Sequence, residues 1–243
     1  MRRAAAIVVA MVGAIGLLAA CHDSGKDAGR AAAARGFPIG EPVPAVATSD
    51  NSFTEARRDQ LNEAATVMTL ADVRDGMTVA DIGAGEGYYT LRLAPRVGHR
   101  GRVLAEDIDG AALTRLGDRV QRERLDNVSI EQGEDADAHL PEASFDRIFM
   151  VHMFHEVSEP YAFLWHMRPA LRPHGRVIVV DIDLPVAAHG IPPAQLFCEF
   201  SAVGFRLTEF IRKPELTGYY AQFEAVGDRP APSAIKACPG RAK

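Results

Sequence analysis

Residues 81–87 read DIGAGEG, an acidic residue followed by glycines at every second position. They follow a short apolar stretch at 78–82 that predicts a β-strand ending at the acid. Glycines remove side chains where a ligand must lie against the main chain. A carboxylate at the strand end suits a cationic group on such a ligand. The segment therefore predicts a ligand-binding loop between a strand and a helix.

The spacing of the glycines separates two kinds of nucleotide site. A nicotinamide dinucleotide site favours Gly-x-Gly-x-x-Gly, which would put its third glycine at Tyr88. The observed Asp-x-Gly-x-Gly-x-Gly instead resembles motif I of class I S-adenosylmethionine-dependent methyltransferases. The resemblance implies that the loop wraps the amino acid end of S-adenosylmethionine, with the acid near its ammonium, directly or through water. The cofactor-binding residues implied here are Asp81, Gly83, Ala84, Gly85 and Gly87.

A second segment of that family follows at the end of the next predicted strand, 102–107. In the family an acid at this place accepts hydrogen bonds from both ribose hydroxyls, and we assign that role to Asp107. Glu106 is the alternative, because side chains alternate along a strand and the pattern does not fix which of the two enters the cleft.

A third segment begins at Gly133 and continues through Leu140-Pro141 to Phe145-Asp146. It resembles the part of the family that contacts the adenine. Two extra residues between the glycine and Leu-Pro leave either Glu134 or Asp135 to meet the adenine amino group. The three segments occur in family order, which makes chance agreement improbable.

Candidates for the methyl acceptor site follow the fourth and fifth strands, because ligands of open α/β sheets bind beyond the carboxyl ends of the strands. Methyl transfer is an in-line displacement, so the protein mainly aligns the acceptor and can remove a proton. We expect His155 to act as the base and Glu156 to orient it or to accept a hydrogen bond from the substrate, the alternative being that both only bond the nearby backbone. The spacing is not that of a helical zinc motif, so we expect no metal. The candidates are His152, His155, Glu156, Asp181 and Asp183.

Alternating helical and strand patterns from residue 53 predict an α/β fold, a seven-stranded, mostly parallel, Rossmann-like sheet with helices on both faces. The resemblance places an antiparallel hairpin at its C-terminal end. The predicted strands are 78–82, 102–107, 128–132, 146–151, 176–181, 205–212 and 218–225, and the predicted helices are 54–69, 88–97, 110–123, 161–171 and 193–203.

The chain begins with Arg2 and Arg3 before an uncharged apolar run at 4–20, which is typical of a signal peptide. The run ends at Leu18-Ala19-Ala20-Cys21, which resembles a bacterial lipobox and implies that Cys21 becomes a lipidated N-terminus. An uncleaved anchor helix or a misassigned start codon is the alternative. We expect a signal peptide at 1–20, a flexible tether at 21–52, the methyltransferase domain at 53–226 and a disordered tail at 227–243. We also expect the protein to be anchored by lipid in the cell envelope and to face the periplasm.

The remaining expectations concern thiols, charge and partners. Cys198 and Cys238 could pair in an oxidising compartment, but the Pro- and Gly-rich surroundings of Cys238 favour two unpaired thiols. The net charge of -5 and the lack of a long basic run argue against a nucleic acid partner.

Three functions compete on this sequence. The first is an active methyltransferase that uses S-adenosyl-L-methionine on a small-molecule acceptor. The second is an envelope lipoprotein that keeps the fold as a ligand-binding module without catalysis, because the cofactor is made in the cytoplasm. An NAD-dependent oxidoreductase ranks below both, because Tyr88 occupies the place of the third glycine.

Overall fold

The computed structural model describes residues 27–43, 54–213, 216 and 218–239. The proposed signal peptide and Cys21 lie outside the described residues, as does most of the predicted tether. The chain divides into a unit at 1–30 and a unit at 31–243. In the first unit the described residues form a turn in which Arg30 pairs with Asp27 at 2.9 Å. The sheet and the helices belong to the second unit.

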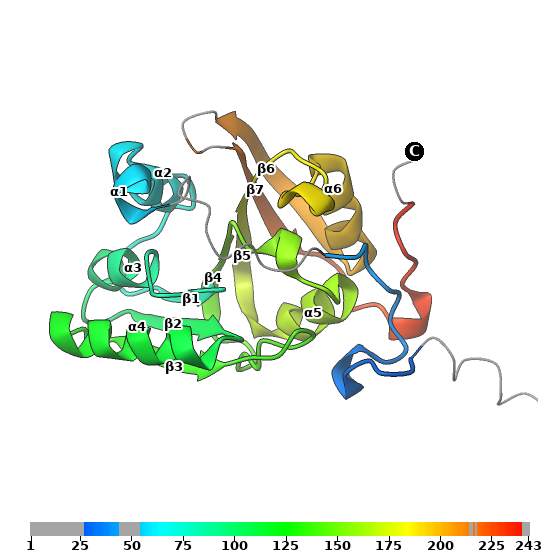
Figure 1. The fold of residues 1–243 in the computed structure, drawn as a ribbon, viewed down its shortest axis with the longest axis horizontal. Coiled ribbons are helices and arrows are strands. Elements are labelled where there is room, and N and C mark those ends of the chain that lie inside the picture. The colour runs from blue at the N-terminus through cyan, green and yellow to red at the C-terminus, as the bar shows by residue number, and fades with distance from the viewer. Residues whose placement is uncertain (1–26, 44–53, 214–215, 217, 240–243) are drawn as a thin grey trace, which may run out of the picture. The chain divides into compact units, whose positions relative to one another are not determined.

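Seven strands form one sheet in the order β3-β2-β1-β4-β5-β7-β6 (Figure 1). Strands β1 to β5 pair in parallel, whereas β7 runs antiparallel to both β5 and β6. This confirms the predicted fold class. The strands are β1 Thr78–Ile82, β2 Arg102–Asp107, β3 Val128–Gln132, β4 Phe145–Val151, β5 Leu171–Asp181, β6 Phe205–Lys213 and β7 Gly218–Ala225.

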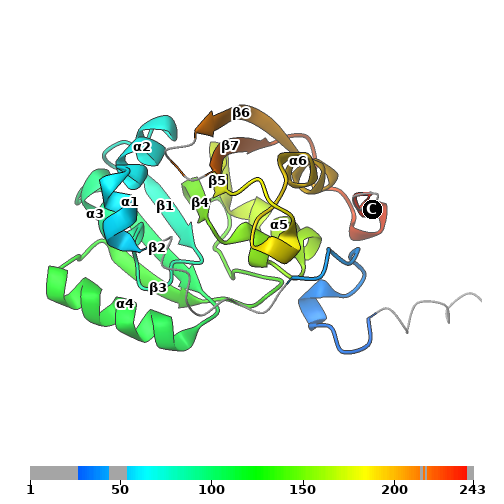
Figure 2. The ribbon, with the colours of Figure 1, turned by 45° about the horizontal axis from the view of Figure 1, so that its top comes forward.

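Helices cover both faces of the sheet (Figure 2). Alternate residues of the strands face opposite ways, so Val79 packs with α2 and α3 while Ala80 packs with α5 and α6. The α-helices are α1 Glu55–Gln60, α2 Glu63–Leu70, α3 Thr90–Val97, α4 Gly110–Glu123, α5 Pro160–Met167 and α6 Pro193–Ala202. The described 3-10 helices are η1 Ala32–Ala34, η3 Phe154–Glu156, η4 Arg168–Ala170, η5 Val186–Ala188 and η7 Pro232–Ala234.

The order of the strands places the ligand site. From β1 the chain goes outward to β2 and β3, and then returns to the other side of β1 with β4 and β5. Ligands of such sheets bind where the strand order reverses, at the carboxyl ends of the strands. Here that point lies beyond the ends of β1 and β4.

The helix predicted at 54–69 is instead two short helices. The chain breaks at Asn62, whose φ of 54° is left-handed, a conformation that asparagine tolerates better than most residues. Thr54 caps α1 by accepting a hydrogen bond from the amide of Arg57 at 3.3 Å. The helix predicted at 88–97 begins only at Thr90, and the one predicted at 161–171 ends at Met167.

Residues 31–43 of the predicted tether are folded onto the domain, which corrects the prediction for this part. Phe37 is buried and packs edge-on against Trp165, with ring centroids 5.4 Å apart. A ring nitrogen of His166 lies 3.1 Å from the carbonyl oxygen of Ala33. Single apolar residues in a Pro- and Gly-rich segment give no periodicity, so the pattern could not show that they enter the core.

The described part of the tail is also held in place, against the prediction of a disordered segment. The indole of Trp165 donates to the carbonyl of Pro230 at 2.8 Å, and the guanidinium of Arg229 stacks 3.5 Å above the same ring. Cys238 forms a disulfide with Cys198 of α6. The expectation of two unpaired thiols is therefore wrong. Among the described residues, no helix has both the length and the apolar character needed to cross a membrane.

Candidate active site

The glycine loop joins β1 to α3, and its three glycines lie in different surroundings. All three have left-handed φ values, 66° at Gly83, 53° at Gly85 and 90° at Gly87. A Cβ at Gly83 would stand 2.9 Å from the Met153 side chain, and one at Gly87 would stand 2.3 Å from Leu116. At Gly85, no described atom lies within 4 Å of the Cβ position. The first and third glycines permit packing, whereas the second faces open space.

Asp81 lies buried at the end of β1, where it accepts a 2.6 Å hydrogen bond from the hydroxyl of Thr90. Burial raises the pKa of Asp81 to about 6, although the Thr90 bond and the charge of Arg58 act in the opposite direction. A carboxylate in this position gains from a cationic ligand nearby, because the ligand would offset the cost of burying the charge.

The two acids at the end of β2 point to opposite faces, because side chains alternate along a strand. Asp107 accepts a 2.7 Å hydrogen bond from the amide of Gly85, so its carboxylate lies against the glycine loop. Ala84 donates its amide to the backbone carbonyl of Glu106 at 2.9 Å, which binds the loop to β2. Asp107 thus lies beside the open space at Gly85, and its assignment to the ribose stays a prediction.

Glu106 is buried, and among the described residues its Oε1 has no hydrogen-bond partner. That oxygen lies against Gly133, where a Cβ would come within 1.9 Å of it. Burial raises the pKa of Glu106 to about 8, and the charges of Asp107, Asp81 and Asp137 add to the shift. At neutral pH the side chain is therefore largely a neutral carboxylic acid.

The segment expected to contact the adenine follows β3. Glu134 and Asp135 both have exposed side chains, and the backbone of Glu134 pairs with Asp137 in an isolated bridge. The geometry does not single out either acid. Sequence reasoning did not name Asp137, which is half-buried and close enough to Glu106 to affect its pKa.

The structure brings together His155, Glu156 and Asp181 of the five acceptor-site candidates. The fully buried carboxylate of Asp181 contacts Nδ1 of His155 at 2.9 and 3.1 Å, and Nε2 of His155 lies 3.9 Å from Glu156 Oε1. Burial by itself would lower the pKa of His155, but the hydrogen bond and charge of Asp181 outweigh it and raise that pKa. Burial also raises the pKa of Glu156, against the charge of His155.

The other two candidates lie in different pairs. A ring nitrogen of His152 lies 3.4 Å from a carboxylate oxygen of Glu63, and Asp183 forms an ion pair with Arg212 at 2.7 Å. His189, which follows η5, faces His155 with ring centroids 6.2 Å apart. No sequence signal links His189 to β4, because the connection after β5 brings it there.

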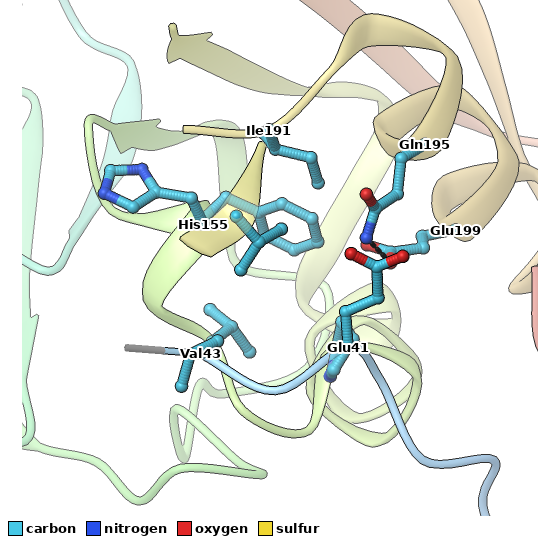
Figure 3. A pocket seen from close by; sticks show the side chains of 10 residues that line it. Glu41, Val43, His155, Ile191, Gln195 and Glu199 are labelled. Carbon is cyan, nitrogen blue, oxygen red and sulfur yellow. Dashed lines mark hydrogen bonds between the residues drawn. The ribbon is translucent and has the colours of Figure 1, made fainter. Parts of the chain in front are cut away.

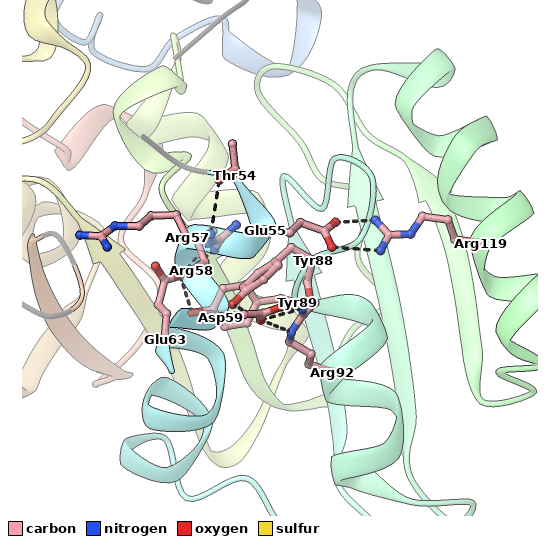
Figure 4. Close-up of polar contacts among 10 residues, drawn as sticks. All are labelled: Thr54, Glu55, Arg57, Arg58, Asp59, Glu63, Tyr88, Tyr89, Arg92 and Arg119. Carbon is pink, nitrogen blue, oxygen red and sulfur yellow. Dashed lines mark hydrogen bonds and ion pairs between the residues drawn. The ribbon is translucent and has the colours of Figure 1, made fainter. Parts of the chain in front are cut away.

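Helices α1 and α2 are fastened beside the glycine loop by a polar cluster (Figure 4). The hydroxyl of Tyr88 donates to Asp59 at 3.0 Å, and the guanidinium groups of Arg58 and Arg92 each lie 3.8 Å from the centre of the Tyr88 ring. The hydroxyl of Tyr89 donates to the buried carboxylate of Glu63 at 3.1 Å. The two tyrosines that follow Gly87 thus attach the loop to the N-terminal helices.

A small cavity of about 10 Å³ lies behind His155 (Figure 3). The imidazole of His155 points away from the middle of this cavity. On the opposite side, Gln195 donates a 3.0 Å hydrogen bond to Glu199, and the side chain of Glu41 lies next to them. Burial raises the pKa of Glu199 to about 7. The cavity has room for about a single water molecule.

Residues 79–175 match the family model described as a methyltransferase domain. That range includes the glycine loop, both acids of β2, and His155 and Glu156, whereas Asp181 lies beyond it. Over these residues the chain is thus similar to methyltransferases. The cofactor is S-adenosyl-L-methionine. The open space at Gly85 lies beside Asp107, and the second carboxylate expected to face this ligand, Asp81, lies at the end of β1 from which the loop starts.

A curated relative shares this part of the domain. The ubiquinone/menaquinone biosynthesis C-methyltransferase of Idiomarina loihiensis is 33% identical over 118 residues, which cover 48% of this chain and 47% of that protein. The chain thus spans about half the length of this relative and of its counterpart in Shewanella frigidimarina.

Solved structures share the fold of the domain at low sequence identity. A SAM-dependent methyltransferase from Aquifex aeolicus superimposes with a TM-score of 0.60 at 23% identity, covering 70% of this chain and 97% of that one. The [4+2]-cyclase SpnF has the same TM-score at 15% identity, covering 74% and 86%. A protein titled a cyclase on this fold shows that the fold alone does not fix the reaction.

Proposed function

We propose that the protein transfers a methyl group from S-adenosyl-L-methionine to a small-molecule acceptor bound beside His155. The observation that carries the proposal is the arrangement of adjacent strand ends. β1 and β2 offer the loop and acids expected to bind the cofactor, and β4 and β5 hold His155 in a fixed orientation through Asp181. Met153 packs against Gly83, so the acceptor end adjoins the cofactor loop.

Asp81, Gly83, Ala84, Gly85, Gly87 and Asp107 would hold the cofactor, whose sulfonium supplies an electrophilic methyl group when it is bound. Asp81 would face the ammonium group and Asp107 the ribose hydroxyls. Because Glu106 is largely neutral and points to the other face, it suits the adenine side of the pocket, near Gly133. Either Glu134 or Asp135 would meet the adenine amino group.

His155 would position the acceptor and take its proton. Asp181 contacts Nδ1, which leaves the Nε2 lone pair to accept a proton from a hydroxyl or amine. Glu156, next to Nε2, would accept a hydrogen bond from the acceptor or orient the ring. The acceptor itself is proposed only as a class, a small molecule with a nucleophilic oxygen or nitrogen.

A transfer assay tests this proposal. The full chain is incubated with methyl-labelled S-adenosylmethionine and a small-molecule extract, and label is followed into new products. His155→Gln should slow labelling at least about tenfold while cofactor affinity is unchanged, since a general base contributes about 10²–10⁴-fold to rate. The matched control is His99→Gln, an exposed histidine between α3 and β2. Cofactor binding without any labelled product would instead support the non-catalytic binding module.

We also propose that the protein is anchored in the cell envelope by lipid on Cys21. The Cys198–Cys238 disulfide supports this proposal, because structural disulfides persist in oxidising compartments such as the periplasm. Cys21→Ser should leave the precursor unlipidated, and cell fractionation with a lipid label measures this directly. An unchanged mobility and unchanged lipid label would exclude Cys21 as the acylated residue.

A further inference from the structure

Three side chains with metal-ligating atoms meet beyond the ends of β4 and β5. His155 and Glu156 belong to η3, and His189 ends the 3-10 helix η5. One ligand atom from each lies within 4.8 Å of the other two. The proposed methyl transfer uses the first two of these residues and gives no role to His189.

Asp181 holds the His155 ring in an orientation that suits metal binding. Imidazoles that bind a metal commonly donate their other N–H to a carboxylate, which fixes the tautomer and makes the ligating nitrogen more basic. Asp181 contacts Nδ1 of His155 in this way and leaves Nε2 on the side of Glu156. The carboxylate is itself held, because its Oδ1 accepts the amide of Ile182 at 2.8 Å.

The other two ligands are placed to close around an ion. The His189 ring stands nearly perpendicular to that of His155, with an interplanar angle of 85°. Its backbone is left-handed, with a φ of 55°, which turns the chain back at the end of η5. His155 is buried, whereas Glu156 and His189 are partly exposed, so an ion could enter from the solvent side. To bring the three ligand atoms to metal-bond distances, the side chains of Glu156 and His189 would each have to move by about 1 Å.

Two neighbouring groups are engaged elsewhere. The carboxylate of Asp183 forms its ion pair with Arg212, and His152 faces Glu63. The site therefore offers two imidazoles and one carboxylate. This donor set is found at catalytic zinc centres, where the fourth position stays open for water or substrate.

We propose that His155, Glu156 and His189 bind a divalent transition-metal ion, represented by Zn²⁺, and that the ion holds the nucleophilic atom of the methyl acceptor. Metal binding stands on its own, and only the role of the ion in holding the acceptor rests on the proposed methyl transfer. An acceptor hydroxyl bound to the ion loses its proton to solvent more readily. Its oxygen then bonds to the methyl carbon as the carbon–sulfur bond breaks, and the electron pair of that bond stays on the sulfur. In the metal-bound protein the Nε2 lone pair serves as a ligand instead of a base.

Metal binding by the full chain tests this proposal without reference to activity. All proteins carry Cys21→Ser, so that this thiol cannot bind the ion, and the other two cysteines already form a disulfide. Zn²⁺ is titrated by calorimetry and Co²⁺ by visible absorption. We expect one ion per chain with micromolar or tighter affinity, and absorption bands of cobalt with nitrogen and oxygen ligands.

Variants locate the site. His189→Ala and Glu156→Gln change partly exposed side chains and should each weaken Zn²⁺ binding at least about tenfold. Asp181→Asn, which removes the group that orients His155, should weaken it about 10–100-fold. His99→Ala removes an exposed imidazole from outside the cluster and should leave the affinity unchanged. Circular dichroism verifies that each variant is folded.

The outcomes separate this proposal from the proposed methyl transfer. Absence of Zn²⁺ binding, or equal affinity of His189→Ala and His99→Ala, would overturn the metal site and show a hydrogen-bonded cluster instead. S-adenosylmethionine is titrated into the same samples. Cofactor binding without metal binding contradicts the metal site alone, whereas metal binding without cofactor binding contradicts the proposed methyl transfer alone.

Discussion

At the scale of single residues, the site is built by side chains whose immediate neighbours decide their charge. Neighbouring positions on β2 illustrate this. Asp107 lies half-buried against the amide of Gly85, while Glu106 is buried and has a pKa of about 8. The two acids are adjacent in sequence, yet only Glu106 lies in surroundings that raise its pKa far enough to keep it largely neutral at pH 7.

Asp107→Asn and Glu106→Gln should therefore behave differently. The first removes a charged hydrogen-bond acceptor and should weaken S-adenosylmethionine binding about tenfold or more, since such bonds contribute about 1.5–3 kcal/mol. The second replaces a neutral acid by a neutral amide and should change the affinity far less. Calorimetric titration of both variants measures this, and a larger loss in Glu106→Gln would reassign the ribose-binding acid.

Glu63 gives a prediction about acid stability. It faces Arg58, Tyr89 and His152, and although burial alone would raise its pKa, His152 and Arg58 lower it to about 2. Because the folded-state pKa is depressed, the ionised form stabilises the fold above the unfolded pKa of about 4.3. That contribution is lost as the pH falls toward 2. Thermal unfolding from pH 7 to pH 2 should therefore show a steeper loss in the native protein than in Glu63→Gln, and parallel curves would contradict this.

At the scale of elements, the sequence predicted the bounds of those strands that local residue patterns determine. The strands at 78–82, 102–107 and 128–132 have the predicted bounds, because each is short and ends at a turn signal. The break at Asn62 was not predictable, since the apolar spacing of a helix continues across it. The approach of His189 to His155 and the pairing of Cys198 with Cys238 depend on tertiary folding, which local patterns do not encode.

The segment before the domain makes a prediction at this scale. Phe37 is buried between Trp165 and His166, so Phe37→Ala should destabilise the protein by about 3 kcal/mol, as is typical of such core truncations. Ile39→Ala is the matched control, because Ile39 is 55% exposed. Denaturant unfolding compares the two. A tether that contributes nothing to the core would give equal and negligible effects.

The C-terminal segment makes a second prediction. The disulfide joins it to α6 across 40 residues of sequence, and the amide of Cys238 donates to the hydroxyl of Tyr161 at 2.7 Å. Cys238→Ser should lower the free energy of unfolding by about 2–4 kcal/mol. Reductant should lower the melting temperature of the native protein toward that of the variant and leave the variant unaffected. A native protein that is insensitive to reductant would show that the bond does not form.

At the scale of the whole molecule, the reversal of strand order at β1 and β4 is what joins the parts into one site. It sets the glycine loop beside the segment that carries His155, and the two meet where Met153 lies against Gly83. The sequence predicted this arrangement through its resemblance to a family with a known strand order. The residue pattern did not predict that both ends of the described domain, near Phe37 and Cys238, pack on α5 and α6.

The central claim is that the space at Gly85 binds S-adenosylmethionine, and calorimetric titration of two glycine variants tests it most directly. Gly85→Asp adds a side chain to that space, whereas Gly76→Asp adds one at a left-handed position before β1, where again no described atom lies within 4 Å. S-adenosylmethionine and S-adenosylhomocysteine should bind the native chain and Gly76→Asp with micromolar affinity, and NAD should not bind. Gly85→Asp should bind none of the three. Unchanged cofactor affinity in Gly85→Asp would contradict the placement of the site.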